Sequence, residues 1–188
     1  MGNSILLVDD ETSVTSAITR ALMDEPCTVY TAQSGTEGIN ILRENTIKVV
    51  VSDEKMPGMS GSEFLSSVKK LFPYTIRIIL TGQASIQAAM TAVNSGEIYR
   101  FFTKPWNEIE LKLAIRSAIE KYDLEEENRR LLKTVKRQAH DLKQLEKSYP
   151  GITDLERDEQ GNLVLPDVCD SDKEISQIVS EIITDPEM

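Results

Sequence analysis

Five short apolar runs, each followed by a segment with helical periodicity, occupy the first two thirds of the sequence. The runs lie at residues 5–8, 28–32, 49–52, 76–80 and 100–102, and the helical segments lie at 14–22, 36–43, 61–70, 86–94 and from 108 onward. Apolar runs this short are typical of strands buried on both faces. Strands that alternate with helices form repeated βα units. The pattern therefore predicts an α/β domain in which helices cover both faces of a five-stranded parallel sheet.

The histidine and cysteine content excludes several classes of site. His140 is the only histidine among 188 residues, and Cys27 and Cys169 are the only cysteines. Zinc hydrolases and His/Asp metal phosphohydrolases need more imidazole or thiolate ligands than these. A histidine relay or a Ser- or Cys-based triad would have to use His140, which lies in a charged helical run. Two cysteines cannot form the disulfide framework of a small secreted domain.

Charge and hydropathy indicate which classes of partner are not expected for this chain. The net charge is −10, and residues 149–188 contribute −9 of it, because eleven acidic side chains there face two basic ones. An acidic segment repels phosphate backbones, so we expect no nucleic-acid partner. The sequence has neither an apolar run long enough to span a membrane nor a signal peptide. We therefore expect a cytoplasmic protein without membrane contact.

The segment that begins near Asn107 is much longer than an ordinary domain helix. Asn107 and Glu110 have the spacing of a capping box, and neither Gly nor Pro follows before Pro150. The first part of this helix is expected to face the sheet through residues at helical spacing, which are Leu111, Ala114, Ile115, Ala118 and Tyr122.

From Leu124 onward the apolar spacing of this helix changes to a heptad. The a positions are Asn128, Val135, Leu142 and Tyr149, and the d positions are Leu124, Leu131, Gln138 and Leu145. An Asn and a β-branched residue at a, with Leu at d, favour a parallel two-stranded coiled coil, so residues 124–149 predict a parallel homodimer. The alternative is a single solvated helix, which the polar core positions and the like-charged pair Asp141 and Glu146 favour.

The acidic segment 150–188 contains a predicted hairpin and a predicted helix. Residues 152–157 and 162–165 flank a turn, and Ser171 and Glu174 form a second capping box. The apolar stripe that follows consists of Ile175, Ile178, Val179, Ile182 and Ile183. Such a stripe packs on its own domain, on a sister subunit or on a partner. The predicted organisation is a domain at 1–121, a coiled-coil helix at 122–149 and a hairpin-plus-helix segment at 150–188.

Polar side chains follow four of the five predicted strands. The residues at these strand ends are Asp9, Asp10 and Glu11, then Asp53, then Thr81, and finally Lys104 with Pro105. Ligands of an open parallel sheet bind beyond the carboxyl ends of its strands. Carboxylate oxygens without thiolate or imidazole favour Mg²⁺, and a nearby hydroxyl and ammonium suit a phosphoryl group. Each residue alone also fits a helix cap, a turn or a strand end, but their combination favours a functional site.

Four stretches of the sequence together resemble the receiver domain of bacterial two-component response regulators. They are LVDDE at 7–11, VSDEKMPGMSG at 51–61, LTG at 80–82 and FFTKP at 101–105, and the resemblance covers residues 4 to about 121. The resemblance implies a flavodoxin-like domain that a sensor histidine kinase phosphorylates on Asp53. A protein of this kind catalyses only its own phosphorylation and dephosphorylation.

The resemblance also implies which residues bind a magnesium ion. Asp10 and Asp53 would bind Mg²⁺ directly, together with the backbone carbonyl of Lys55. Asp9 would act through a metal-bound water. The ionised carboxylate of Asp53 is already a nucleophile at neutral pH, so its reaction requires no general base.

Further roles follow from the same resemblance. Thr81 and Lys104 would hold phosphoryl oxygens, and the Lys104–Pro105 bond is expected to be cis. Thr81 and Phe101 occupy the positions of the switch hydroxyl and the switch aromatic residue. Lys55 and Gln83 would set the lifetime of the phosphorylated state by controlling access of the attacking water.

The output of this switch is predicted less directly. The segment FFTKPW at 101–106 and the helix after it are similar to receivers attached to cyclic-dinucleotide phosphodiesterases or hydrogenase regulators. The favoured interpretation is that phosphorylation switches dimerisation, or the docking of an unidentified protein target, through the coiled coil and the C-terminal segment. The alternatives are the regulatory receiver of a larger enzyme, such as a cyclic-dinucleotide phosphodiesterase or cyclase, and a phosphate sink.

Overall fold

The computed structural model describes residues 2–82, 85–94, 96–149, 156–157 and 163–164. The chain divides into two compact units, Met1–Arg130 and Leu131–Met188, which are described separately below. The elements in chain order are β1 Asn3–Val8, α1 Thr12–Ala21, β2 Cys27–Ala32, α2 Gly35–Glu44, β3 Val49–Asp53, α3 Gly61–Leu71, β4 Ile76–Thr81, α4 Ile86–Asn94, β5 Arg100–Thr103, α5 Glu108–Ser148, β6 Glu156–Arg157 and β7 Leu163–Val164.

The first unit is built on a five-stranded parallel sheet with strand order β2-β1-β3-β4-β5. This order is that of the flavodoxin-like doubly wound fold, and it brings β1 and β3 side by side at the point where the winding direction reverses. The predicted α/β class, the five strands and the flavodoxin-like topology are thus confirmed. The carboxyl ends of β1 and β3 meet at this switch point.

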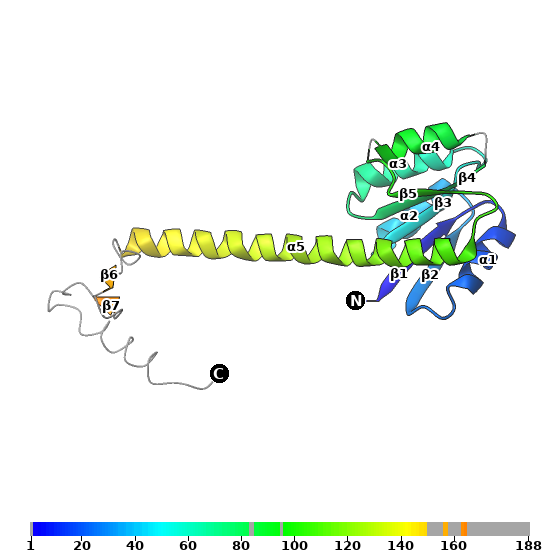
Figure 1. Ribbon diagram of the computed structural model, residues 1–188. Coiled ribbons are helices and arrows are strands. Elements are labelled where there is room, and N and C mark those ends of the chain that lie inside the picture. Colours follow the sequence, from blue (N-terminus) through cyan, green and yellow to red (C-terminus); the bar gives the residue numbers. More distant parts are fainter. Residues whose placement is uncertain (1, 83–84, 95, 150–155, 158–162, 165–188) are drawn as a thin grey trace. The chain divides into compact units, whose positions relative to one another are not determined.

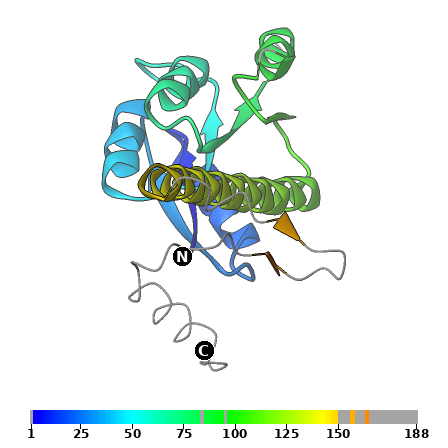
Figure 2. The same ribbon diagram turned by 90° about the vertical axis from the view of Figure 1, so that its left-hand side faces the viewer.

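Each face of the sheet carries its own apolar core. Side chains of α1 and α5 pack on one face, against Ile5, Leu7 and Val51, and side chains of α2, α3 and α4 pack on the other, against Leu6, Val8 and Val50. Figure 1 and Figure 2 show these helices on opposite sides of the strands. Odd- and even-numbered residues of one strand point to opposite faces, which is why the predicted runs are apolar throughout.

Three strands extend one residue further than the apolar runs predict. β3, β4 and β5 end at Asp53, Thr81 and Thr103, because ladder pairing continues past the last apolar residue. Two of the polar residues expected just after strands therefore belong to the strands themselves. A side chain on a hydrogen-bonded strand is held more rigidly than one in a loop, which favours a precise site.

Helix α5 runs from Glu108 to Ser148 without a break. The Asn107 side chain accepts hydrogen bonds from the backbone amides of Ile109 and Glu110, as its predicted capping role requires. The predicted sheet-facing residues of this helix, Leu111, Ala114, Ile115, Ala118 and Tyr122, are all buried.

The second unit contains the rest of α5 and a small hairpin. β6 and β7 pair antiparallel over two residues each, so the predicted hairpin is present, although the described strands are shorter than the predicted ones. Its turn and the predicted helix with the stripe from Ile175 to Ile183 lie outside the described residues. Among the described residues, no helix is both long and apolar enough to cross a membrane.

Candidate functional site

The expected polar residues meet at the carboxyl edge of the sheet. Asp9 directly follows β1, Asp53 ends β3, Thr81 ends β4, and Lys104 follows β5. The ladder places Asp53 opposite Leu80 and Thr81 opposite Thr103, and the Lys104 amide donates to the carbonyl of Thr81 over 2.8 Å. Regular backbone hydrogen bonding therefore sets the spacing between Asp53, Thr81 and Lys104.

Three carboxylates converge at this edge. Asp9, Asp10 and Asp53 each offer an oxygen, and these oxygens lie within 4.8 Å of one another. The Asp9 and Asp53 residues are only 1% and 5% exposed, whereas Asp10 is exposed. Buried like charges repel one another at this distance, so the cluster favours a bound cation. Its donor set of carboxylate oxygens fits a hard divalent ion such as Mg²⁺.

The first two acidic residues are not helix caps. α1 begins at Thr12, and its N-cap is Glu11, whose side chain makes no capping hydrogen bond. The Asp9 carboxylate instead accepts a hydrogen bond from the backbone amide of Glu11 over 2.9 Å. The alternative interpretation of Asp9 and Asp10 as simple capping residues is therefore not supported.

Lys104 connects the two buried carboxylates. Its Nζ lies 2.9 Å from Oδ2 of Asp9 and 2.5 Å from Oδ1 of Asp53. Burial lowers the pKa of Lys104, but its hydrogen bonds to Asp53 and Asp9 raise the pKa by more, so that it lies above its ordinary value. The raised pKa favours the charged ammonium of Lys104, which lies directly against the Asp53 carboxylate.

Burial has the opposite consequence for Asp9. It raises the pKa of this carboxyl above its ordinary value, and hydrogen bonds from Lys104 and from the Glu11 amide only partly oppose the rise. The neighbouring charge of Asp53 adds to it. One ammonium thus does not fully compensate the buried acids, and a second cation would favour the ionised form of Asp9.

The loop after β3 holds the Asp53 carboxylate from the other side. The Lys55 amide donates to Oδ2 of Asp53 over 2.8 Å, and the Ser52 hydroxyl donates to the Asp53 carbonyl over 2.9 Å. The loop closes through Glu54, whose carboxylate accepts hydrogen bonds from the Ser62 amide and hydroxyl. This closure keeps the Lys55 backbone beside Asp53.

Gly61 is a site residue whose role sequence reasoning missed, although it lies within one of the motifs quoted above. A Cβ atom at Gly61 would lie 2.0 Å from the carbonyl oxygen of Asp53 and 2.9 Å from the Cα of Glu54. Only glycine allows α3 to begin this close to the end of β3. Its position at the start of a predicted helix was the available signal, since glycine is a poor helix former.

The remaining predicted residues lie around this cluster. Thr81 is fully buried, and its hydroxyl donates to the carbonyl of Gly82 over 3.2 Å. Phe101 is half-buried and packs against the core under α2, α3 and α4. The Lys104–Pro105 peptide bond is cis, as expected. Gln83 lies outside the described residues.

Comparison with known proteins matches this geometry to a family. The sequence profile of the response regulator receiver domain matches residues 5–116. The chain belongs to the response regulator receiver family. The receiver fold and the sequence motifs at its carboxyl edge therefore have a common explanation, and family members act in two-component systems with histidine kinases.

Curated relatives of this receiver are regulators of transcription. The hydrogenase transcriptional regulatory protein HoxA of Cupriavidus necator is 34% identical over 128 residues, and the transcriptional regulatory protein GlrR of Escherichia coli is 35% identical over 116 residues. These matches cover 68% and 62% of this chain but only 26% of each relative. The chain thus matches about a quarter of these proteins. Because they regulate transcription, the expectation that no nucleic acid is involved is not supported.

Solved structures show the same receiver fold in varied contexts. The structure of an adenylate cyclase from Rhodopirellula baltica has a TM-score of 0.68 and 34% identity, covering 71% of this chain and 98% of that one. NtrX from Brucella abortus, solved in complex with ADP, has a TM-score of 0.64 and 27% identity, covering 70% of this chain and 30% of that one.

Proposed function

We propose that this receiver accepts a phosphoryl group on Asp53 from the phosphohistidine of a sensor histidine kinase. The observation that supports the proposal best is the buried Asp53 carboxylate, which lies against the Lys104 ammonium and within 4.8 Å of two further carboxylates. A nucleophilic carboxylate, a fixed cation and a candidate metal site are the three components that phosphoryl transfer to an aspartate requires.

The proposed reaction exchanges one bond to phosphorus for another. A carboxylate oxygen of Asp53 forms a bond to phosphorus, and the bond from phosphorus to the imidazole nitrogen of the kinase breaks. The products are an acyl phosphate on Asp53 and a free histidine. Lys104 stabilises the negative charge on the transferring oxygens, and the Lys55 amide orients the carboxylate.

The carboxylate cluster would hold Mg²⁺ through Asp10, Asp53 and the Lys55 carbonyl, with Asp9 acting through a water. The bound ion would neutralise repulsion between the carboxylates and the incoming phosphoryl group. Three carboxylate oxygens within 4.8 Å support this assignment. The pairing of Lys104 with both Asp9 and Asp53 indicates how the chain balances these charges itself.

We further propose how the modified state is read and how long it lasts. The buried Thr81 hydroxyl would turn from the Gly82 carbonyl to a phosphoryl oxygen, and the half-buried Phe101 would move inward. The side chains of Lys55 and Gln83 would control access of the water that hydrolyses the acyl phosphate. The protein would catalyse no other reaction.

The output in this proposal is a change in dimerisation or partner docking. Apolar residues of α5 beyond the receiver core are exposed in the single chain, which supports a parallel homodimer through 124–149. The segment 150–188 would bind a protein target. Because the match covers only 26% of these relatives, the regulatory part of a larger regulator or enzyme is the second candidate. A phosphate sink is the third.

Mass spectrometry with a small-molecule donor tests the chemical step. The full chain is incubated with acetyl phosphate and Mg²⁺, and we expect one added phosphoryl group that Asp53→Asn abolishes. Glu44→Gln, a change of an exposed carboxylate at the end of α2 and outside the cluster, serves as the matched control and should keep the adduct. Absence of an adduct on the wild-type chain would overturn the proposal.

Light scattering tests the output. We expect the molar mass of the full chain to change when beryllofluoride and Mg²⁺ are added, because beryllofluoride mimics a phosphoryl group on Asp53. A phosphorylated chain whose mass and partners are the same as those of the unmodified chain would favour the phosphate sink.

A further inference from the structure

A buried lysine lies at the amino edge of the sheet, opposite to the candidate phosphoacceptor site. Lys48 immediately precedes β3, and its side chain is 7% exposed. Its Nζ lies 2.5 Å from Oδ1 of Asp123 and donates to Oδ1 of Asn3 over 2.8 Å. A buried ammonium is tolerated only when such partners are present. The receiver therefore depends on Asp123, a residue of α5 beyond the predicted domain end at 121.

A second contact joins the same stretch of α5 to another loop. The Arg129 guanidinium lies 3.8 Å from the ring centroid of Tyr74, which is in the connection between α3 and β4, and 5.9 Å from that of Tyr122. A guanidinium stacked on an aromatic face is held by cation–π attraction. This contact lies two helical turns after Tyr122, whose ring centroid also lies 5.9 Å from the Nζ of Lys48.

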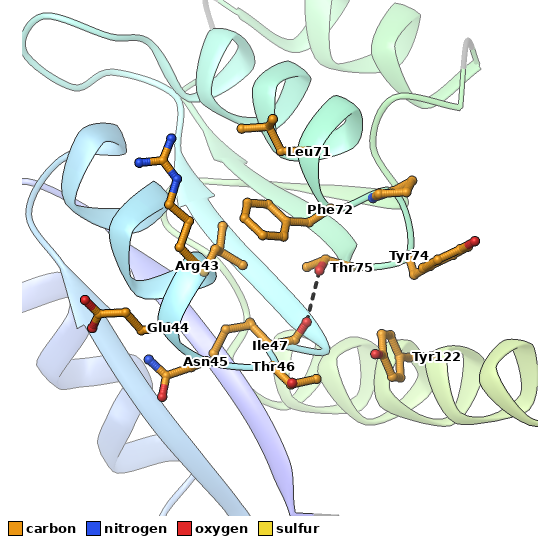
Figure 3. Close-up of a pocket in the computed structure, with 12 residues that line it drawn as sticks. Arg43, Glu44, Asn45, Thr46, Ile47, Leu71, Phe72, Tyr74, Thr75 and Tyr122 are labelled. Carbon is orange, nitrogen blue, oxygen red and sulfur yellow. Dashed lines mark hydrogen bonds between the residues drawn. The ribbon is translucent and has the colours of Figure 1, made fainter.

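A cavity lies beside Tyr74 and Tyr122. It has a volume of about 400 Å³ and is lined by Tyr74, Tyr122 and residues of the loops before β3 and β4. Figure 3 shows Tyr74 and Tyr122 beside the hydrogen bond that the Thr75 hydroxyl donates to the Ile47 carbonyl over 3.0 Å. That bond fixes the two loops to each other. The surface that α5 contacts at this edge is therefore held in place by a hydrogen bond between its loops.

The residues of α5 that carry these contacts gather on one side of the helix. Tyr122, Glu126 and Arg129 are spaced i, i+4 and i+7, so they share a face. Tyr122 is 8% exposed and Arg129 is half-buried. Leu124, which is 62% exposed, and Asn128 lie on the opposite face, as the helical repeat of 3.6 residues requires. The contacts thus fix the rotation of α5 about its own axis.

We propose that residues 122–130 of α5 form a clamp, closed by Lys48–Asp123 and Arg129–Tyr74, that couples the receiver to the helix. Lys48, which directly precedes β3, and Asp53, which ends it, are five residues apart, or about 17 Å along an extended strand. With the clamp closed, a shift of β3 turns the Leu124 face. Without the clamp, α5 does not follow the shift of β3. The structural part of this proposal stands alone, and the regulatory part rests on the proposed phosphorylation of Asp53.

Hydrogen exchange of the full chain tests the clamp itself. Asp123→Ala should speed amide exchange across 122–130 by about tenfold, because it leaves the Lys48 charge without its carboxylate. Tyr74→Ala should speed exchange in the same residues by a smaller factor. Tyr74 is exposed and away from the core, so this variant stays informative if Asp123→Ala unfolds the domain. Arg137→Ala, further along the same helix, is the matched control and should leave 122–130 unchanged.

An apolar replacement separates ion pairing from packing. Lys48→Met combined with Asp123→Leu removes both charges and keeps the side-chain volume, so protection of 122–130 should return toward that of the wild-type chain. Unchanged exchange in both Asp123→Ala and Tyr74→Ala would overturn the clamp. Equal acceleration by Arg137→Ala would overturn it as well, since the effect would then belong to the whole helix.

The regulatory part has its own measurement. In the wild-type chain, beryllofluoride with Mg²⁺ should change exchange at 122–130, and in Tyr74→Ala or Arg129→Ala this change should be at least halved. Both variants should still gain a phosphoryl group from acetyl phosphate. If the wild-type chain gains the group but exchange at 122–130 does not respond, the coupling is wrong. If no chain gains the group, it is the proposed phosphorylation that fails.

Discussion

The two edges of the receiver sheet use buried charge in opposite ways. At the carboxyl edge one ammonium, that of Lys104, faces the buried carboxylates of Asp9 and Asp53 with a third carboxylate nearby. At the amino edge one buried ammonium, that of Lys48, faces one carboxylate and one amide oxygen. The first edge has an excess of negative charge that an added cation would relieve, and the second is already balanced. Excess charge marks the candidate reactive site, whereas balanced charge marks a structural contact.

A substitution in the backbone of the carboxyl edge should have the largest effect on the free energy of unfolding. Gly61→Ala should lower the free energy of unfolding by more than about 3 kcal/mol, because the new Cβ would overlap the Asp53 carbonyl and force α3 or β3 to move. Urea unfolding measures the loss. Gly82→Ala is the matched control, since a Cβ there would meet nothing within 4 Å. Equal stability of both variants would show that the close approach at Gly61 is unimportant.

Replacement of the Lys104 ammonium at the carboxyl edge should lower the free energy of unfolding, and Mg²⁺ should restore part of the loss. Lys104→Met leaves two buried carboxylates unpaired and should lower the free energy of unfolding by about 3 kcal/mol without Mg²⁺. Saturating Mg²⁺ should restore part of this loss, because a ligand that binds only the folded state stabilises it. Thermal unfolding with and without the ion measures both effects. A loss that Mg²⁺ does not reduce would contradict the charge-excess interpretation.

The balanced edge should behave differently. Asp123→Ala should lower the free energy of unfolding by about 2 kcal/mol, less than a fully buried pair would lose because the Asp123 side chain is 47% exposed. Mg²⁺ should not restore the loss, since the carboxylate cluster found among the described residues lies at the other edge. The same thermal unfolding experiment provides the comparison. If Mg²⁺ restored the stability of Asp123→Ala to the same extent as that of Lys104→Met, the proposed difference between the two edges would be wrong.

A single carboxylate change at the carboxyl edge should have a small effect on stability. Asp10→Asn removes an exposed like charge and should raise the free energy of unfolding by about 0.5 kcal/mol without Mg²⁺. It should also weaken the stabilisation that Mg²⁺ provides. A Mg²⁺ titration followed by thermal unfolding measures both, with Asp24→Asn as the control. A variant as responsive to Mg²⁺ as the wild-type chain would exclude Asp10 as a ligand.

A surface ion cluster provides the smallest expected effect, which depends on pH. Hydrogen bonds from Arg116 and Lys112 lower the pKa of Glu25 below its ordinary value of 4.5, with the Arg116 bond contributing most. A lowered acid pKa stabilises the fold above 4.5, and this contribution is lost as the pH falls through the pKa of the folded state. Glu25→Gln should therefore differ from the wild-type chain near neutral pH and converge with it in acid. A constant difference at all pH values would contradict this assignment.

Much of the molecule could be predicted because its determinants are local in the sequence. Apolar runs such as 49–52 and the helical spacing between them are enough to place the strands and helices, since burial on both faces leaves few other arrangements. The polar residues that follow the strands indicate one edge, because the carboxyl ends of parallel strands meet there. The cap at Asn107 was expected for a similarly local reason, whereas the cis bond before Pro105 was implied by the family resemblance.

The sequence by itself determined the fold class, the strand positions and the residues at the carboxyl edge. Only the tertiary structure decided which charged side chains form ion pairs with each other. Lys48 and Asp123 are 75 residues apart and Lys104 and Asp9 are 95 apart, so no periodicity connects them. The tertiary structure also places Asp123 and Arg129, which follow the predicted domain end at 121, against the receiver. The physical reason is that patterning reports which face of a helix is apolar, whereas an ion pair or a close backbone contact depends on distances that only the folded chain sets.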